Sequence, residues 1–212
     1  MKTTITISRQ MGSAGSYLGL LIARHLNIRY IDREVLQLAA EEFGVEPAVI
    51  EARAEKLSSF WEKMLRGFTF GTPDLKYAPP PLPVITDQEL FDKQTEIMKI
   101  LAKKNDCVIV GWGGTFVLPR HDKTMTIFCH APLDFRINRV MKVYNAPDEE
   151  AAREMINESD EMRKKYIAQL TGKDWACTEN YDLAINTSLL PLEKTADLII
   201  EIIKETGIAA DS

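Results

Sequence analysis

Residues Ile5 to Tyr17 read Ile-Thr-Ile-Ser-Arg-Gln-Met-Gly-Ser-Ala-Gly-Ser-Tyr, and this is the stretch that says most about the fold. A short strand with β-branched residues enters a turn of glycine and serine, and the turn leads into a helix. Free backbone N–H groups in such a turn and the positive end of the helix dipole both attract anions. The segment therefore predicts a loop that holds the phosphates of a nucleotide; the alternative is an ordinary glycine-rich turn.

The loop departs from the usual phosphate-binding pattern G-x-x-x-x-G-K-[ST]. With Ser16 in the hydroxyl position, Gly15 takes the place of the lysine, Ala14 that of the second glycine and Arg9 that of the first. We expect phosphate to bind at the backbone of Gly12, Ser13, Ala14, Gly15 and Ser16. Arg9 is the only cation inside the loop. Because a guanidinium bridges phosphate oxygens, we expect Arg9 to replace part of the missing charge; the alternative is a surface salt bridge.

The composition predicts a globular protein with one well-packed core. The chain has 212 residues, of which 45% are hydrophobic and 27% charged. The net charge of −5, from 26 basic and 31 acidic residues, argues against a nucleic-acid partner. No apolar run is long enough to span a bilayer, and the N-terminus leads directly into a strand without the pattern of a signal peptide. These features predict a cytoplasmic protein with no membrane partner.

The cysteines are consistent with that compartment. Cys107, Cys129 and Cys177 are odd in number and far apart in the sequence, and two of them fall in expected strands. This spacing favours reduced thiols over a disulfide framework or a zinc site.

Strand and helix patterns alternate along the chain. Expected strands, separated by helical patterns, cover residues 5–7, 28–31, 107–110, 125–129 and 183–185. Apolar strands separated by helices predict a parallel sheet covered on both faces. Residues 44–86 interrupt this rhythm with an expected helix from Pro47 to about Met64 and the proline-rich run 79–83. After it, one helical face is formed by Leu90, Phe91, Gln94, Ile97, Met98 and Leu101.

Four further segments carry a family resemblance through their order and spacing. They are Val108-Ile-Val-Gly-Trp-Gly-Gly114, His130-Ala-Pro-Leu-Asp-Phe-Arg-Ile-Asn-Arg139, Ser159-Asp-Glu-Met-Arg163 and Tyr181-Asp-Leu-Ala-Ile-Asn-Thr-Ser188. With the first strand and loop, they resemble the nucleoside monophosphate kinase group of P-loop proteins, and most of all the cytidylate kinase-like family. The resemblance covers nearly the whole chain except the 44–86 segment.

The resemblance implies a three-layer α/β P-loop kinase fold: a five-stranded parallel sheet with helices on both faces and a helical lid. Residues 1–212 would form a single domain, with 44–86 as an insertion on the acceptor side and 150–175 as the lid. The implied activity is phosphoryl transfer from ATP to a nucleoside monophosphate, with Mg²⁺ as cofactor, and the resemblance favours an acceptor of the cytidylate type. The partners would then be small-molecule nucleotides, and a homodimer is compatible with the sequence.

The resemblance also implies roles for individual residues near the phosphates. Ser16 would bind Mg²⁺ through its hydroxyl, or else cap its own helix. Arg136 and Arg139 would reach toward the phosphates between the two substrates, or else lie on a solvated helix face. Asp160 and Arg163 match a short motif of the family's lid, whose closure excludes water.

On the acceptor side, Asp32 matches the acidic residue that ends the family's second strand, although an Asp there also suits a helix N-cap. Two of the family's arginines are absent. Gly111-Trp112-Gly113 stands where cytidylate kinases have Gly-Arg-Asp, and Leu38 stands at the second position. Arg33 is a partial substitute, and Trp112 either stacks on a base or fills space. The sequence thus leaves a second hypothesis: a catalytically weakened nucleotide-binding module with a sensing or scaffolding role.

Overall fold

Five strands form one parallel sheet in the computed structural model, which describes residues 1–32 and 87–209. In sequence order they are β1 (Thr4–Arg9), β2 (Arg29–Ile31), β3 (Cys107–Val110), β4 (Thr124–His130) and β5 (Leu183–Asn186). Their spatial order is β2-β3-β1-β4-β5, and each neighbouring pair runs parallel. The predicted α/β fold with a five-stranded parallel sheet is confirmed.

The central position of β1 determines where its loop emerges. Ile5 of β1 is in register with Val108 of β3 on one side and with Met125 of β4 on the other, and all three side chains are buried. From β1 the chain passes β3 to reach β2, and from β3 it passes β1 to reach β4, so the connections diverge between β1 and β3. The carboxyl ends of these two strands are therefore the point of the sheet where α/β proteins most often bind ligands.

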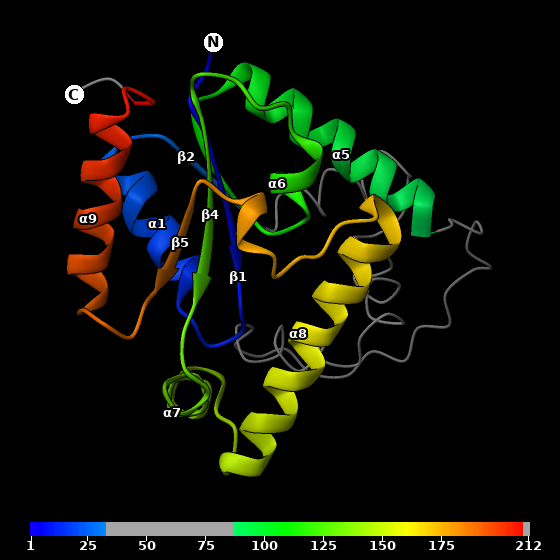
Figure 1. Cartoon of the computed structure of the whole chain (residues 1–212), viewed down its shortest axis with the longest axis vertical. Helices are drawn as coiled ribbons and strands as arrows, with labels where there is room; N and C mark the ends of the chain where they lie inside the picture. Colours follow the sequence, from blue (N-terminus) through cyan, green and yellow to red (C-terminus); the bar gives the residue numbers. More distant parts are fainter. Residues whose placement is uncertain (33–86, 210–212) are drawn as a thin grey trace, which may run out of the picture.

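Helices cover both faces of the sheet, as predicted (Figure 1). On one face α1 (Gly15–His25) and α9 (Leu192–Glu205) pack together, and their buried residues join the strands in one core that includes Leu18, Ile22, Ile199 and Ile203. On the other face lie α5 (Asp87–Lys104) and the short α6 (Gly114–Val117). The six residues predicted to form one face of α5 are all buried: Leu90, Phe91, Gln94, Ile97, Met98 and Leu101.

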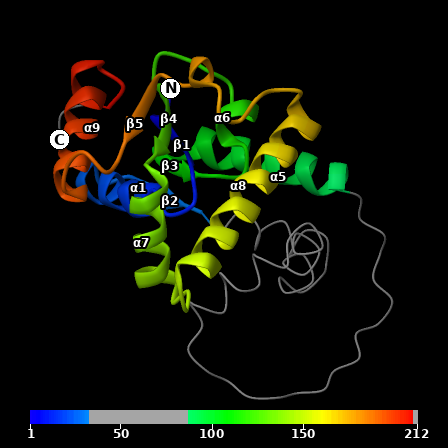
Figure 2. The same cartoon turned by 60° about the horizontal axis from the view of Figure 1, so that its bottom comes forward.

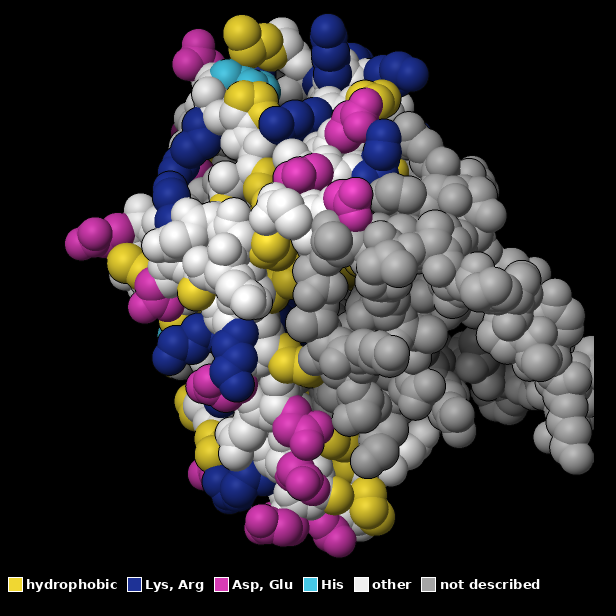
Figure 3. Space-filling view, turned by 90° about the vertical axis from the view of Figure 1, so that its right-hand side faces the viewer, with side chains coloured by type: hydrophobic (Ala, Val, Ile, Leu, Met, Phe, Trp, Pro, Cys, Tyr) yellow, Lys and Arg dark blue, Asp and Glu magenta, His cyan; other side chains and the backbone are white. Residues whose placement is uncertain are grey.

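Two further helices lie at the carboxyl end of the strands. Figures 1 and 2 both show α7 (Leu133–Tyr144) and the start of α8 (Glu149–Thr171) at this end, after which α8 runs back toward α5. The 3₁₀ turn η1 (Thr178–Asn180) then leads into β5. Figure 3, which faces the side of α5 and α8, shows acidic and basic side chains intermixed over the described surface.

The helix predicted to form the lid, α8, is held down by more core contacts than its sequence indicates. The apolar pattern of residues 150–175 is weak, yet one side of the helix is buried. Ala152, Ile156, Ser159 and Ile167 are all buried. The first two pack with Met11, Ile137 and Val140 in a cluster shared with α7.

Both cysteines placed in strands are core thiols, as predicted. Cys107 and Cys129 are free and buried, and burial raises the pKa of each to about 12. Within residues 1–32 and 87–209, no group of His, Cys, Asp or Glu side chains has the arrangement of a metal site. None of the described helices is both long and apolar enough to cross a membrane.

Several predictions concern residues outside the described ranges. These are the helix from Pro47 to about Met64, the proline-rich run 79–83, Arg33 and Leu38.

Candidate active site

The loop after β1 is braced from within by polar contacts. Ser13 is fully buried, and its Oγ donates to the Gln10 carbonyl at 2.8 Å. The Thr187 hydroxyl donates to the Ser13 carbonyl, also at 2.8 Å. Two residues of the loop have left-handed backbone, Gly12 with φ 79° and Ala14 with φ 63°. The chain is thereby turned tightly into α1, which begins at Gly15.

This turn leaves backbone donors available at the start of α1. The N–H groups of Ala14, Gly15 and Ser16 have no acceptor among the described residues. Ser16 is half-buried, and within the same part of the chain its Oγ makes no hydrogen bond. Unpaired N–H groups at a helix N-terminus suit an anion, and an unengaged hydroxyl suits a hydrated cation beside that anion. The loop residues thus fit a phosphate with Mg²⁺.

Arg9 fills the space next to the position where the usual loop has its lysine. A Cβ on Gly15 would lie only 2.5 Å from the Arg9 Cβ, and a Cβ on Gly111 would collide with Arg9 Nη1. The Arg9 side chain is 11% exposed, and its Nη2 lies 4.0 Å from Asp32 Oδ1. The two glycines therefore make room for the Arg9 guanidinium between β1 and β3.

Asp160 of α8 joins the loop to two more arginines. Its Oδ1 accepts the Met11 N–H at 2.8 Å and also lies 3.2 Å from Arg163 Nη1, while its Oδ2 accepts from Arg136 Nη1 at 2.6 Å. The three charged side chains are between 11% and 18% exposed. Burial, together with the nearby Arg9 guanidinium, lowers the pKa of Arg163 to about 10. The structure thus brings Arg9, Arg136 and Arg163 together beside the loop.

Arg139 lies apart from this group. Its guanidinium carbon is 6.0 Å from the centroid of the Tyr17 ring, and the Tyr17 hydroxyl donates to Glu193 at 3.1 Å. Tyr17 is exposed, so Arg139 lies on the outer side of α1 rather than with Asp160 and Arg163.

On the acceptor side, the structure connects Trp112 to Asp32. The indole Nε1 of Trp112 donates to the Asp32 carbonyl at 2.7 Å, and the Asp32 carboxylate accepts from the Tyr30 hydroxyl at 3.2 Å. Trp112 has φ 55° between Gly111 with φ 81° and Gly113 with φ 73°. Left-handed backbone costs about 1–2 kcal/mol for a residue with a Cβ, so the tight turn after β3 is held there by its surroundings.

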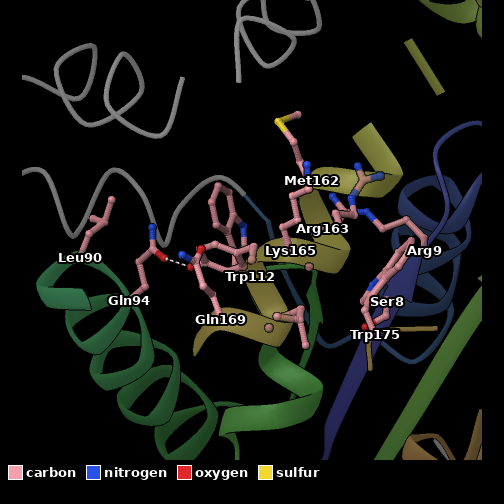
Figure 4. Close-up of a pocket in the computed structure, with 14 residues that line it drawn as sticks. Ser8, Arg9, Leu90, Gln94, Trp112, Met162, Arg163, Lys165, Gln169 and Trp175 are labelled. Carbon is pink, nitrogen blue, oxygen red and sulfur yellow. Dashed lines mark hydrogen bonds between the residues drawn. The ribbon is translucent and has the colours of Figure 1, made fainter. Parts of the chain in front are cut away.

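A cavity of about 220 Å³ opens between the carboxyl ends of β1 and β3 and the helices α5 and α8 (Figure 4). Arg9, Trp112 and Arg163 line it, as expected for site residues. Gln94, Tyr166 and Trp175 line it as well, although the sequence does not mark them as site residues. A sequence signal did exist for Gln94, because it is the polar member of an otherwise apolar helix face.

Comparison with known proteins identifies the family of this chain. The cytidylate kinase-like family model matches residues 4–189. The chain belongs to the cytidylate kinase-like family. A cytidylate kinase from Sulfolobus acidocaldarius is 29% identical over 124 residues, which are 56% of this chain and 65% of that protein's length.

Solved structures with similar folds include an uncharacterized protein from Eubacterium ventriosum and a shikimate kinase from Bacteroides thetaiotaomicron. The first has a TM-score of 0.66 and 22% identity, and the alignment covers 96% of this chain and 99% of that one. The second has a TM-score of 0.51 and 13% identity, with coverage of 95% and 98%. At these identities the likeness shows the fold alone.

Proposed function

We propose that this chain transfers a phosphoryl group from ATP to a nucleoside monophosphate, of the cytidylate type or close to it. The observation that carries the proposal is the grouping of Arg9, Arg136 and Arg163 beside a loop with unpaired N–H donors. Phosphoryl transfer needs such positioning and positive charge more than it needs a covalent catalyst. Membership in the cytidylate kinase-like family supports the same reaction.

In the proposed reaction the loop holds the ATP phosphates. The N–H groups of Ala14, Gly15 and Ser16 donate to phosphate oxygens, and the Ser16 hydroxyl is the ligand that this loop offers to Mg²⁺. Bound Mg²⁺ supplies charge that offsets the negative charge of the transferring group. An acceptor phosphate oxygen forms a bond to the γ-phosphorus while the bond from that phosphorus to the β,γ-bridging oxygen breaks, which leaves ADP.

The arginines act on the group in transfer. In the described structure Asp160 is the anion that Arg136 and Arg163 contact. Phosphate oxygens carry more charge and present the same acceptor geometry, so the two guanidinium groups can turn to them when nucleotides bind. Arg9 lines the cavity and also adjoins Gly15, and this supports a role for it between the two proposed substrates.

One observation favours the second hypothesis, a catalytically weakened nucleotide-binding module. Gly15 offers no amine to the phosphates, and Asp160 already occupies the Met11 N–H and two of the arginines. A chain in this state would bind ATP without turning it over.

A coupled assay of ADP release separates the two hypotheses. The purified protein is incubated with ATP, Mg²⁺ and each nucleoside monophosphate in turn, and turnover is expected with a pyrimidine acceptor. Arg163→Ala, purified in the same way, should lose it, which excludes a contaminating kinase, whereas Arg24→Ala on the exposed end of α1 should retain it. ATP binding without turnover supports the binding module, and neither binding nor turnover contradicts both hypotheses.

A further inference from the structure

The cavity has two chemically different ends. Figure 4 shows Leu90 and Gln94 reaching in from α5 on one side, with Arg9 and Arg163 on the opposite side and Trp112 between them. The described lining residues from α5, Leu90 and Gln94, are uncharged, whereas the other end carries two guanidinium groups; Lys165 of α8 lines the cavity near Trp112. A ligand that suits both ends has a planar apolar part and an anionic part.

Gln94 is the polar group at the uncharged end. Gln94 is only 1% exposed, and it lies on the face of α5 that otherwise buries leucine, isoleucine, methionine and phenylalanine. Its Oε1 accepts a hydrogen bond from the Tyr166 hydroxyl at 2.9 Å. The Tyr166 ring is held edge-on against Phe91, with centroids 5.7 Å apart and an interplanar angle of 78°. This contact fixes which way the amide of Gln94 faces.

The other half of that amide is its NH₂ group, which can donate hydrogen bonds. Among the residues that the structure describes, Gln94 Nε2 has no acceptor, and it belongs to a residue that lines the cavity. Most N–H donors in folded proteins have a partner, and one that lies at a cavity without a protein acceptor is available to a ligand. A ligand with an acceptor atom at this end of the cavity would satisfy it.

We propose that Gln94 selects the base of the phosphoryl acceptor. Its Nε2 would donate to a carbonyl oxygen or a ring nitrogen of the base, while the Tyr166 hydroxyl holds Oε1. This inference rests on the proposed function, and it assigns the α5 end of the cavity to the ring and the Arg9 end to the phosphate.

Calorimetric titration with CMP, UMP and ribose 5-phosphate tests the assignment. Gln94→Met keeps the length of the side chain and removes the donor, and it should weaken binding of both nucleotides about tenfold. Ribose 5-phosphate has no base, so its affinity should not change. Gln88→Met on the exposed face of the same helix is the matched control and should bind all three ligands like the unaltered protein.

Tyr166→Phe provides a second variant in case Gln94→Met does not fold. It leaves the amide in place but removes the hydroxyl that orients it, so nucleotide binding should weaken by a smaller factor and ribose 5-phosphate binding should again be unchanged. Equal nucleotide affinity in the Gln94→Met and unaltered proteins overturns the inference and leaves the proposed function standing. A parallel loss for ribose 5-phosphate also overturns it. Failure of the unaltered protein to bind either nucleotide overturns the inference and the proposed function together.

Discussion

Arg9 lies beside the position where the loop lacks a lysine. Gly15 stands in that position, and a Cβ on it would lie only 2.5 Å from the Arg9 Cβ. A side chain at position 15 would therefore require residue 9 or the start of α1 to shift. We expect Arg9, at the end of β1, to supply part of the charge that a lysine at the start of α1 would supply.

We therefore expect Arg9→Ala to lower turnover on the order of a hundredfold, because one well-placed donor to a transferring phosphoryl group contributes roughly 3 kcal/mol. Steady-state kinetics measure the loss, and thermal melting checks that the fold is kept, since Arg9 also packs against Gly15 and Gly111. Arg24→Ala serves as the exposed control. An unchanged rate in Arg9→Ala would show that Arg136 and Arg163 supply the charge.

The sequence predicted those site residues that carry a local pattern and missed those assembled by packing. Arg9, Asp160 and Arg163 stand in short motifs, and the structure brings them together beside the loop. Arg136 and Arg139 looked equivalent in the sequence, one helical turn apart, yet only Arg136 contacts Asp160. The difference depends on the angle at which α7 meets α8, which no local pattern encodes. Tyr166 of α8 could not be predicted as a cavity residue, because its place there depends on its contacts with Gln94 and Phe91 of α5.

At the scale of elements, α8 shows why a charged helix can still be well anchored. Its buried side includes the small residues Ala152 and Ser159, which add little to an apolar pattern, and Ala152 packs in the cluster shared with α7. Asp148 caps its first turn by accepting the Ala151 N–H at 2.8 Å. The remaining link to the loop is electrostatic, through Asp160. Ligands can therefore act on α8 through one carboxylate and the arginines around it.

Asp160→Asn should loosen this link and cost about 2 kcal/mol of folding free energy, because hydrogen bonds to charged groups contribute roughly 1.5–3 kcal/mol. Amide hydrogen exchange should be faster around residues 157–171, and Glu158→Gln on the exposed side of the helix should leave the exchange rate unchanged.

In the unaltered protein, a bisubstrate nucleotide should slow amide hydrogen exchange in residues 150–175, because phosphates stabilise the state in which the arginines contact them. Equal protection with and without that nucleotide would contradict the assignment of α8 as a lid.

At the scale of the whole molecule, the parallel sheet could be predicted because apolar strands alternated with helices. The strand order β2-β3-β1-β4-β5 was not predicted from that alternation. Right-handed crossovers limit the choices, but the position of each strand depends on which helix pairs pack together, here α1 with α9. The strand order matters for function because it places Arg9, at the carboxyl end of β1, in the middle of the sheet. Trp112, in the turn after the neighbouring strand β3, lines the same cavity.

That edge joins parts of the chain that are distant in sequence, so a ligand bound there should stabilise the whole fold. ATP with Mg²⁺ would contact the β1 loop and the arginines of α7 and α8 together, and a ligand at about 100 times its dissociation constant adds about 2.7 kcal/mol to the stability of the native state. We expect millimolar ATP with Mg²⁺ to raise the melting temperature by several degrees. Adenosine, which lacks phosphates, should give no comparable shift, and Ser16→Ala should reduce the part of the shift that depends on Mg²⁺. A melting temperature that millimolar ATP leaves unchanged would count against phosphate binding at Gly12 to Ser16, and with it against both proposed functions.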